Sequence, residues 1–156
     1  MSTPTLEYRK FVKSSIIPTS LDGLQRFHEE PEALAKLTPP PVIMQLHRDA
    51  RRSLTEGDIE FTLWLGPLPI RWIARHEPGP SPHSFADMQV KGPMAYWRHE
   101  HVFAEKPNGV ELTDRIVLAH RPGLIGVLTR LFFDGPPLRL LFAYRHLRTR
   151  MATRLQ

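Results

Sequence analysis

The sequence predicts an α+β domain in which a curved antiparallel β-sheet of about seven strands wraps around a long C-terminal helix. Three observations support this fold class. One strand-like segment is followed by a short helical stretch, residues 42–119 have the pattern of consecutive strands, and residues 124–156 carry apolar side chains at helical spacing. A chain of 156 residues is long enough to bury one core, so we expect a single domain over residues 1–156.

The first elements are a strand and two short helices. Residues 6–17 are rich in β-branched and aromatic side chains, which is typical of a strand. Residues 19–37 place leucine and phenylalanine at helical spacing, and Thr19 or Ser20 can serve as the N-cap. Because proline cannot continue a helix, Pro31 divides this stretch into two short helices.

The middle of the chain predicts a run of antiparallel strands. Its segments alternate apolar and polar residues and are separated by glycine, proline, asparagine or aspartate, as expected for short turns. The longest break, at residues 77–83, is the loop with most room to move. The predicted strands are residues 42–48, 58–66, 70–77, 84–90, 95–103 and 109–119.

The C-terminal part predicts two apolar-faced helices. Leucine, valine and phenylalanine recur at helical spacing in residues 124–133 and again after Leu138. Gly135, Pro136 and Pro137 lie between the two stretches and indicate a break or kink. Residues 124–133 are too few to cross a bilayer, so we expect no transmembrane segment.

Composition excludes several classes of function. The chain has no cysteine, which rules out disulfides, a thiolate nucleophile and cysteine-containing zinc sites. No Gly-rich phosphate loop, dinucleotide fingerprint or nucleophile-elbow motif is present. The absence of cysteine also gives no sign of an oxidising compartment, so we expect a cytoplasmic location.

The basic charge is concentrated near the C-terminus. The net charge is +5 and the isoelectric point is about 10.0, but no nucleic-acid-binding motif accompanies the arginines. We therefore expect a solvated helix face and no nucleic-acid partner. The alternative is a helix that docks on acidic lipid or nucleic acid, which requires association that weakens as salt rises. The arginines are Arg139, Arg145, Arg148, Arg150 and Arg154.

Side-chain alternation places acids and imidazoles on one face of neighbouring strands. A four-residue connection at residues 91–94 sets the register of the first hairpin, and a loop at residues 104–111 sets the second. Two carboxylate–imidazole pairs result, Asp87 with His99 and His101 with Asp114. The other predicted neighbours are Gln89 with Trp97, Phe85 with His101, Phe103 with Leu112, and His99 with Ile116.

The same face carries apolar and aromatic residues, so we expect it to be the concave side of the sheet. In residues 58–66 the apolar side chains Ile59, Phe61, Leu63 and Leu65 alternate with polar ones. The expected ligand-binding residues are Phe61, Leu63, Trp72, Phe85, Asp87, Gln89, Trp97, His99, His101 and Asp114.

One string of residues resembles a known family. The pattern F-x-D-x-Q-x-x-G-P-x-x-x-W-x-H-x-H-x-F at residues 85–103, with L-T-D at 112–114 and Y-R-H at 144–146, is similar to a bacterial branch of the SRPBCC superfamily whose members mostly lack an assigned reaction. The superfamily includes START lipid-binding domains, the birch-pollen-allergen group and polyketide cyclase/dehydrase proteins. The resemblance implies the helix-grip fold and an internal cavity for an apolar small molecule.

Two functions are compatible with these residues. The first is binding of an apolar or aromatic small molecule, lipid- or polyketide-like, whose polar end the acids and imidazoles orient. The alternative is a polyketide cyclase/dehydrase-like enzyme in which His99 or His101 is the base and Asp87 or Asp114 its orienting partner. A third interpretation is structural: each pair is a satisfied buried hydrogen bond.

Other sites receive weaker support. Two histidines and an aspartate can ligate a metal, but each imidazole already has a carboxylate partner, so we expect no metal and no cofactor. Arg145 either pairs with a buried acid such as Asp114 or covers apolar surface with its stem. No spacing shared with a candidate nucleophile is found for His28, His47, His76, His83 and His120. The exposed aromatic and proline-rich segments are candidates for a homodimer interface.

Overall fold

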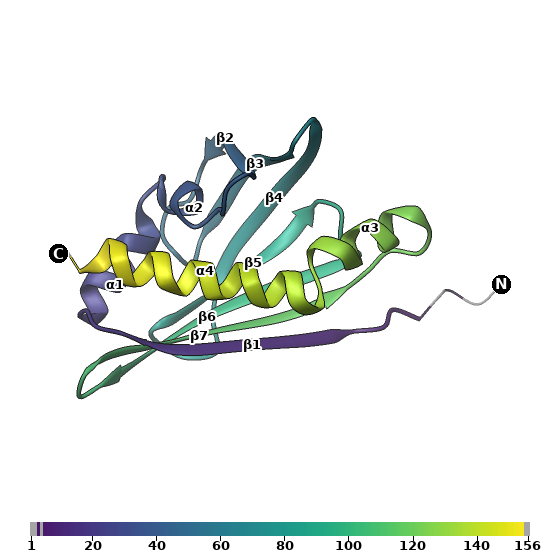
Figure 1. Ribbon diagram of the computed structural model, residues 1–156. Coiled ribbons are helices and arrows are strands. Elements are labelled where there is room, and N and C mark those ends of the chain that lie inside the picture. The colour runs from purple at the N-terminus through teal and green to yellow at the C-terminus, as the bar shows by residue number, and fades with distance from the viewer. Residues whose placement is uncertain (1–2, 4, 155–156) are drawn as a thin grey trace.

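A computed structural model describes residue 3 and residues 5–154. Seven strands form one antiparallel sheet in the order β1-β7-β6-β5-β4-β3-β2, and the long helix α4 lies across the sheet (Figure 1). The strands are β1 (Arg9–Ile17), β2 (Ile43–Asp49), β3 (Gly57–Leu65), β4 (Leu68–Pro78), β5 (Ser84–Lys91), β6 (Tyr96–Lys106) and β7 (Gly109–Ala119). The helices are α1 (Leu21–Glu29), α2 (Ala33–Lys36), α3 (Leu124–Phe132) and α4 (Gly135–Thr153).

The predicted fold class is confirmed. Two short helices follow β1, and Ser20 is the N-cap of α1, where its hydroxyl accepts a hydrogen bond from the amide of Gly23 at 3.0 Å. The first strand begins three residues later than the sequence indicated, at Arg9. Alternation was weak at that end of the segment, and strand boundaries are the least reliable part of a pattern reading.

The predicted register of the two central hairpins is confirmed, but the predicted loop at residues 104–111 is wrong, because β6 and β7 stay paired up to Lys106 and Gly109. Phe85 lies opposite His101 and Asp87 opposite His99 in the β5–β6 pair, while His101 lies opposite Asp114 and His99 opposite Ile116 in the β6–β7 pair. Phe103 lies opposite Leu112, also as predicted. The ladder between β5 and β6 ends at Met88 and Arg98, one step before the predicted neighbours Gln89 and Trp97.

The C-terminal helices differ in how they pack. Asp134 caps α4, its carboxylate accepting the amide of Gly135 at 2.9 Å, and the two prolines occupy the first turn, where their missing N–H groups cost nothing. Helix α4 buries one face, made of Leu138, Phe142, His146, Thr149 and Thr153. Helix α3 instead buries only Gly126 and Thr129, and its apolar side chains are largely exposed. Among the described residues, no helix is long and apolar enough to cross a membrane.

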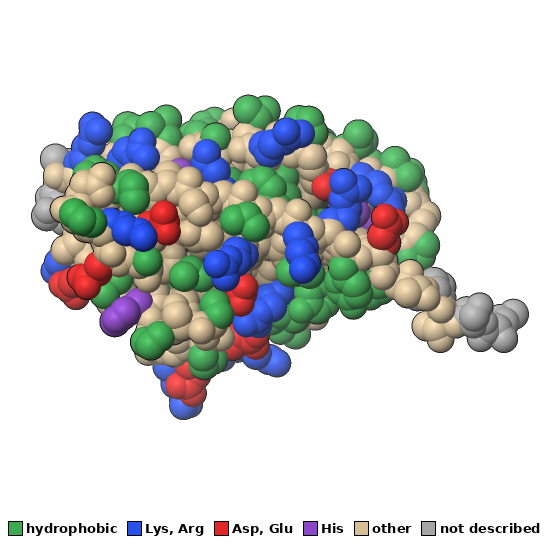
Figure 2. All heavy atoms as spheres, turned by 90° about the horizontal axis from the view of Figure 1, so that it is seen from below, with side chains coloured by type: hydrophobic (Ala, Val, Ile, Leu, Met, Phe, Trp, Pro, Cys, Tyr) green, Lys and Arg blue, Asp and Glu red, His purple; other side chains and the backbone are tan. Residues whose placement is uncertain are grey.

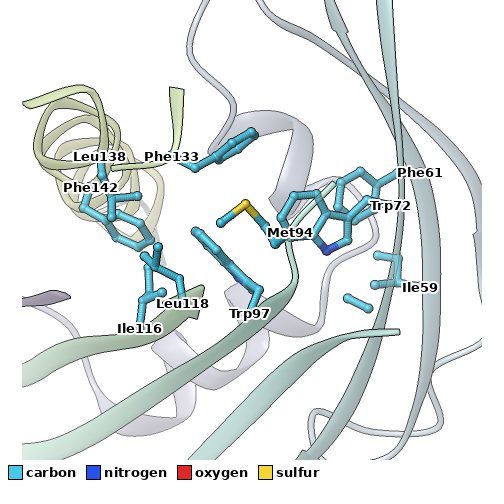
Figure 3. Close-up of a cluster of buried hydrophobic side chains, with 11 residues drawn as sticks. Ile59, Phe61, Trp72, Met94, Trp97, Ile116, Leu118, Phe133, Leu138 and Phe142 are labelled. Carbon is cyan, nitrogen blue, oxygen red and sulfur yellow. The ribbon is translucent and has the colours of Figure 1, made fainter. Parts of the chain in front are cut away.

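The main core lies between the sheet and α4. Trp72 and Trp97 meet edge to face with ring centroids 5.5 Å apart, and Phe133 packs against both rings. Figure 3 shows Met94 beside these rings and Phe142 of α4 above Ile116 and Leu118. A second cluster, which includes Phe85, Phe103 and Leu112, fills the space under α1.

Candidate functional site

A cavity of about 500 Å³ lies between the concave face of the sheet, α2 with the loop that follows it, and α4. Most of its wall is apolar or aromatic, and four of its polar side chains, His76, Asp87, His99 and His101, come from β4, β5 and β6. A ligand site of this size that combines apolar walls with a few polar groups suits a small organic molecule. The apolar wall includes Leu37, Ile59, Phe61, Leu63, Trp72, Trp97, Phe133 and Leu141; the polar side chains include His28, His76, Asp87, His99, His101 and Arg145.

Most of the expected ligand-binding residues border this cavity. They are Phe61, Leu63, Trp72, Phe85, Asp87, Trp97, His99 and His101. Two of the ten do not border it. Asp114 lies behind the imidazoles and is 3% exposed. Gln89 instead closes the β5–β6 connection: its side-chain amide donates to the carbonyl of Met94 and accepts from the amide of Met94, both at 2.9 Å.

The two imidazoles and two carboxylates form one connected cluster, which we call the imidazole–carboxylate cluster (Asp87, His99, His101 and Asp114). The shortest contacts are diagonal across the sheet: His99 Nε2 lies 2.7 Å from Asp114 Oδ1, and His101 Nε2 lies 2.8 Å from Asp87 Oδ2. The pairs that lie directly opposite are longer, 3.8 Å for His99 Nδ1 to Asp87 Oδ2 and 3.2 Å for His101 Nδ1 to Asp114 Oδ1. Diagonal neighbours meet because these side chains are long enough to reach along the strands.

Asp114 has a further partner that the sequence reading missed. His146 of α4 places Nε2 2.7 Å from Asp114 Oδ2, and its Nδ1 contacts the hydroxyl of Ser15 on β1. The only signal for His146 in the sequence was the Y-R-H string at residues 144–146, and the sequence analysis assigned a role there to Arg145 alone. The terminal helix is thus tied to the sheet through the same carboxylate that holds the cluster.

The environment separates the pKa values of the two cluster imidazoles. Burial alone would lower the pKa of His101, but hydrogen bonds and charge from Asp114 and Asp87 outweigh it and raise this pKa to about 9. Burial and the neighbouring charge of His101 lower the pKa of His99. Burial alone would raise the pKa of Asp114, but the charge of His99 and hydrogen bonds from His101, His146 and His99 hold it well below its usual range. His101 is therefore charged and His99 neutral near pH 7.

Two more histidines line the cavity although nothing in their spacing pointed to it. His28 of α1 is buried next to His101, with ring centroids 5.7 Å apart, and its Nδ1 is 2.9 Å from the carbonyl of Leu24. Burial and the charge of His101 lower the pKa of His28 to about 3. The ring of Phe85 stacks on His101 at 4.2 Å and on His76 at 5.5 Å.

The arginines of α4 are mostly used inside the fold. Arg145 does not contact Asp114; its guanidinium lies over the ring of Phe142 at 5.3 Å, and within the described residues its Nε has no hydrogen-bond partner. Arg148 and Arg150 donate to the carbonyls of Lys36 and Ile16. On the face shown in Figure 2, Lys and Arg side chains are spread among acidic and apolar ones. Arg145 thus has the packing role that was one of its two predicted roles, and the predicted solvated face is wrong for Arg148 and Arg150, which are half-buried.

The protein has an antiparallel sheet that curves around a C-terminal helix and encloses a cavity large enough for a small-molecule ligand. This is the helix-grip fold, and solved structures share it. A protein from Chromobacterium violaceum superposes with a TM-score of 0.68 at 14% identity, covering 92% of this chain and 96% of its own. At such identity the likeness establishes the fold.

Two further solved structures with this fold are enzymes by name. An aromatase/cyclase from Streptomyces superposes with a TM-score of 0.64 at 11% identity, covering 94% of this chain and 92% of its own. Norcoclaurine synthase from Thalictrum flavum, in complex with dopamine and hydroxybenzaldehyde, gives 0.65 at 9% identity, with 97% and 90% covered. No protein-family model matches the sequence. No curated protein matches it.

Proposed function

We propose that this protein binds an apolar or aromatic small molecule, lipid- or polyketide-like, with its polar end against the imidazole–carboxylate cluster. The observation that carries the proposal is the cavity itself: about 500 Å³, mostly apolar, with Asp87, His99 and His101 on its wall. The solved synthase with two aromatic molecules bound supports the same use of the fold.

The wall and the cluster divide the work of binding. Trp72 and Phe61 stack with ring centroids 6.2 Å apart and offer flat apolar surface to an aromatic or acyl group. Burying such surface contributes roughly 25 cal/mol per Å², without fixing orientation. The Asp87 carboxylate keeps acceptor positions beyond the one that its bond to His101 uses, so a hydroxyl at one end of the ligand can donate to it and set the ligand's direction.

Native mass spectrometry of protein purified gently from its own host tests this proposal. We expect a stoichiometric apolar compound that is released on denaturation. A parallel titration with the fluorophore anilinonaphthalene sulfonate reports whether the cavity accepts an aromatic probe. Protein that carries no compound and takes up no probe would overturn the binding proposal.

A second candidate function is acid–base catalysis of the cyclase/dehydrase kind, and the separated pKa values of His99 and His101 favour it. Enzymes use neighbouring groups whose environments drive their pKa values apart as acid and base. Here His101 would donate to a developing oxyanion the Nε2 proton that it shares with Asp87. His99 Nδ1, which lies 3.8 Å from Asp87 Oδ2, would accept a proton from carbon.

Kinetics distinguish catalysis from simple binding. With a polyketide-like substrate, we expect turnover to be lost in His99→Gln and His101→Gln and to fall in wild-type protein as pH rises past the pKa of His101, about 9. The control is His47→Gln, an exposed histidine on β2 that bonds Thr62 away from the cavity. Equal rates in all three variants would rule out the enzyme and leave binding.

Three wider statements are also proposals. We propose that residues 1–156 act as one ligand-binding domain, located in the cytoplasm and without a nucleic-acid partner. A homodimer stays a prediction; the exposed apolar side chains of α3 are where we would look for its interface. Light scattering after size-exclusion chromatography, at low and high salt, measures the mass and shows whether charge or apolar contact controls association.

A further inference from the structure

Three ligand-type atoms of the cluster converge on one point at the cavity wall. Asp87, His99 and His101 each offer one ligand atom, a carboxylate oxygen or a ring nitrogen, and these three atoms lie within 4.8 Å of one another. The Asp87 Oδ2 atom is 2.8 Å from His101 Nε2 and 3.8 Å from His99 Nδ1. Ligand atoms around a tetrahedral metal with bonds of about 2.0–2.2 Å are separated by roughly 3.3 Å, so the observed separations bracket that value.

The opposite nitrogens of both imidazoles point to a single carboxylate. His99 Nε2 and His101 Nδ1 lie 2.7 and 3.2 Å from the same oxygen, Asp114 Oδ1. The N–H that His99 Nε2 donates to Asp114 leaves a lone pair on His99 Nδ1, which faces Asp87. His101 Nε2 can bind a metal once the proton that it shares with Asp87 has left, because Nδ1 of the same ring still faces Asp114. Metal-binding histidines usually donate their second nitrogen to a carboxylate in this way. A structural pair of hydrogen bonds would not require both imidazoles to share one acceptor.

The layer behind the cluster is rigid, and the front is open. Asp114 is held on its other oxygen by His146, which in turn contacts Ser15. The converging residues sit on neighbouring strands, where backbone motion is small, and all three border the cavity. Three protein ligands with an open side characterise catalytic rather than structural metal sites.

We propose that Asp87, His99 and His101 bind one divalent transition-metal ion, with its open coordination positions facing the cavity. Two imidazoles and one carboxylate suit zinc, iron(II), cobalt(II) or nickel(II) better than magnesium or calcium, which prefer oxygen ligands. The metal would take the place of the proton shared between His101 and Asp87. This inference is independent of the proposed function; where both hold, an oxygen of the bound molecule completes the coordination.

Metal titration of chelator-treated protein, without any organic ligand, tests the site. We expect one Co²⁺ ion per chain with the visible absorption of four- or five-coordinate cobalt, and Zn²⁺ that displaces it in calorimetry. Asp87→Asn and His99→Gln should each weaken Co²⁺ binding at least about 100-fold, and Asp114→Asn, a positioning change, about 10–100-fold. His47→Gln should bind like wild-type.

An NMR measurement on the wild-type protein tests the metal site even if a cluster variant does not fold. Substoichiometric Co²⁺ should shift the ring signals of His99 and His101 in the NMR spectrum and leave those of His47 in place. The proposed metal site is refuted if wild-type protein binds no Co²⁺ at micromolar concentration. It is also refuted if binding survives Asp87→Asn and the ring signals of His99 and His101 do not shift. Because probe uptake and native mass spectrometry need no metal, the proposed function passes or fails separately.

Discussion

The polar and aromatic parts of the cavity wall are built on different principles. In the imidazole–carboxylate cluster, each group is fixed by directional hydrogen bonds from neighbouring strands and from α4. In the aromatic wall, which we define as Phe61, Trp72, Trp97 and Phe133, the rings contact one another at centroid separations of 5.5–6.2 Å without such bonds. Figure 3 shows the four rings, three from strands and Phe133 from the connection between α3 and α4.

The difference matters because the two kinds of contact respond differently to change. A hydrogen-bonded buried charge is costly to leave without its partner, so the cluster holds one arrangement. Aromatic surface contributes binding energy in proportion to its area and tolerates small shifts. The wall can therefore accept a range of apolar groups, while the cluster selects the polar end.

The largest effect is expected for Asp114→Asn. This change removes the carboxylate that three imidazoles share, in a site that is 3% exposed. Removing one partner of a buried ion pair typically costs about 3–5 kcal/mol, and we expect the free energy of unfolding in urea to fall by that amount.

A matched control for Asp114 is Asp58→Asn. Asp58 pairs with Arg75 at 3.0 Å on the exposed side of β3 and β4. Exposed pairs contribute no more than about 1 kcal/mol, so this variant should unfold close to wild-type. A similar loss in both variants would mean that the cluster has no special role in stability.

A smaller effect is expected from the pH dependence of His28. Its pKa is about 3 in the folded protein against 6.5 ordinarily, so below pH 6.5 the unfolded chain binds a proton that the folded protein excludes. Stability therefore falls as pH falls. Between pH 7 and pH 5, His28 should account for a loss of about 2 kcal/mol.

Urea unfolding of His28→Leu at both pH values isolates this contribution. Wild-type should lose about 2 kcal/mol more than the variant between pH 7 and pH 5, because leucine fills the site without binding a proton. Other buried groups titrate in both proteins and cancel in the difference. Equal losses would mean that His28 is protonated in the folded protein.

The strands and their register could be predicted because they depend on local signals. Alternation identifies the inner face, and the short turn at residues 91–94 fixes which residues lie opposite one another. Asp87, His99 and His101 were found in this way, since all three are on adjacent strands of one hairpin. Nothing comparable determined the shorter diagonal bonds, which depend on side-chain torsions rather than on register.

Residues that reach the site from distant elements could not be predicted. His28 comes from α1 and His146 from α4, and only the packing of those helices on the sheet brings them to the cluster. Gln89 has the alternation of a cavity residue, yet its amide finds closer partners in Met94. The exposed apolar residues of α3 show the same limit, because helical spacing does not say what covers a face.

Leu63→Trp should weaken binding at the aromatic wall and leave the imidazole–carboxylate cluster unchanged. Leu63 borders the cavity from β3, and a larger ring there takes up ligand volume without touching the cluster. We expect affinity for anilinonaphthalene sulfonate to fall at least about tenfold, or 1.4 kcal/mol, while Co²⁺ binding stays unchanged. Val12→Trp adds the same ring on an exposed position of β1 and is the control. Unchanged probe affinity in Leu63→Trp would place the probe elsewhere.

Ser15→Ala should have the smallest effect, and it tests the hydrogen bonds that lie behind the cluster. The Ser15 hydroxyl contacts Nδ1 of His146, whose other nitrogen bonds Asp114. Losing one hydrogen bond of this kind costs about 1 kcal/mol, measured by urea unfolding. The neighbouring Ser14→Ala is the control, since its hydroxyl bonds Thr113 and is exposed. If the contact also positions Asp114, Ser15→Ala weakens Co²⁺ binding and Ser14→Ala does not. Equal Co²⁺ binding in both variants would mean that Ser15 contributes only to the stability of the fold. In that case the contacts from His99, His101 and His146 fix the carboxylate of Asp114 by themselves.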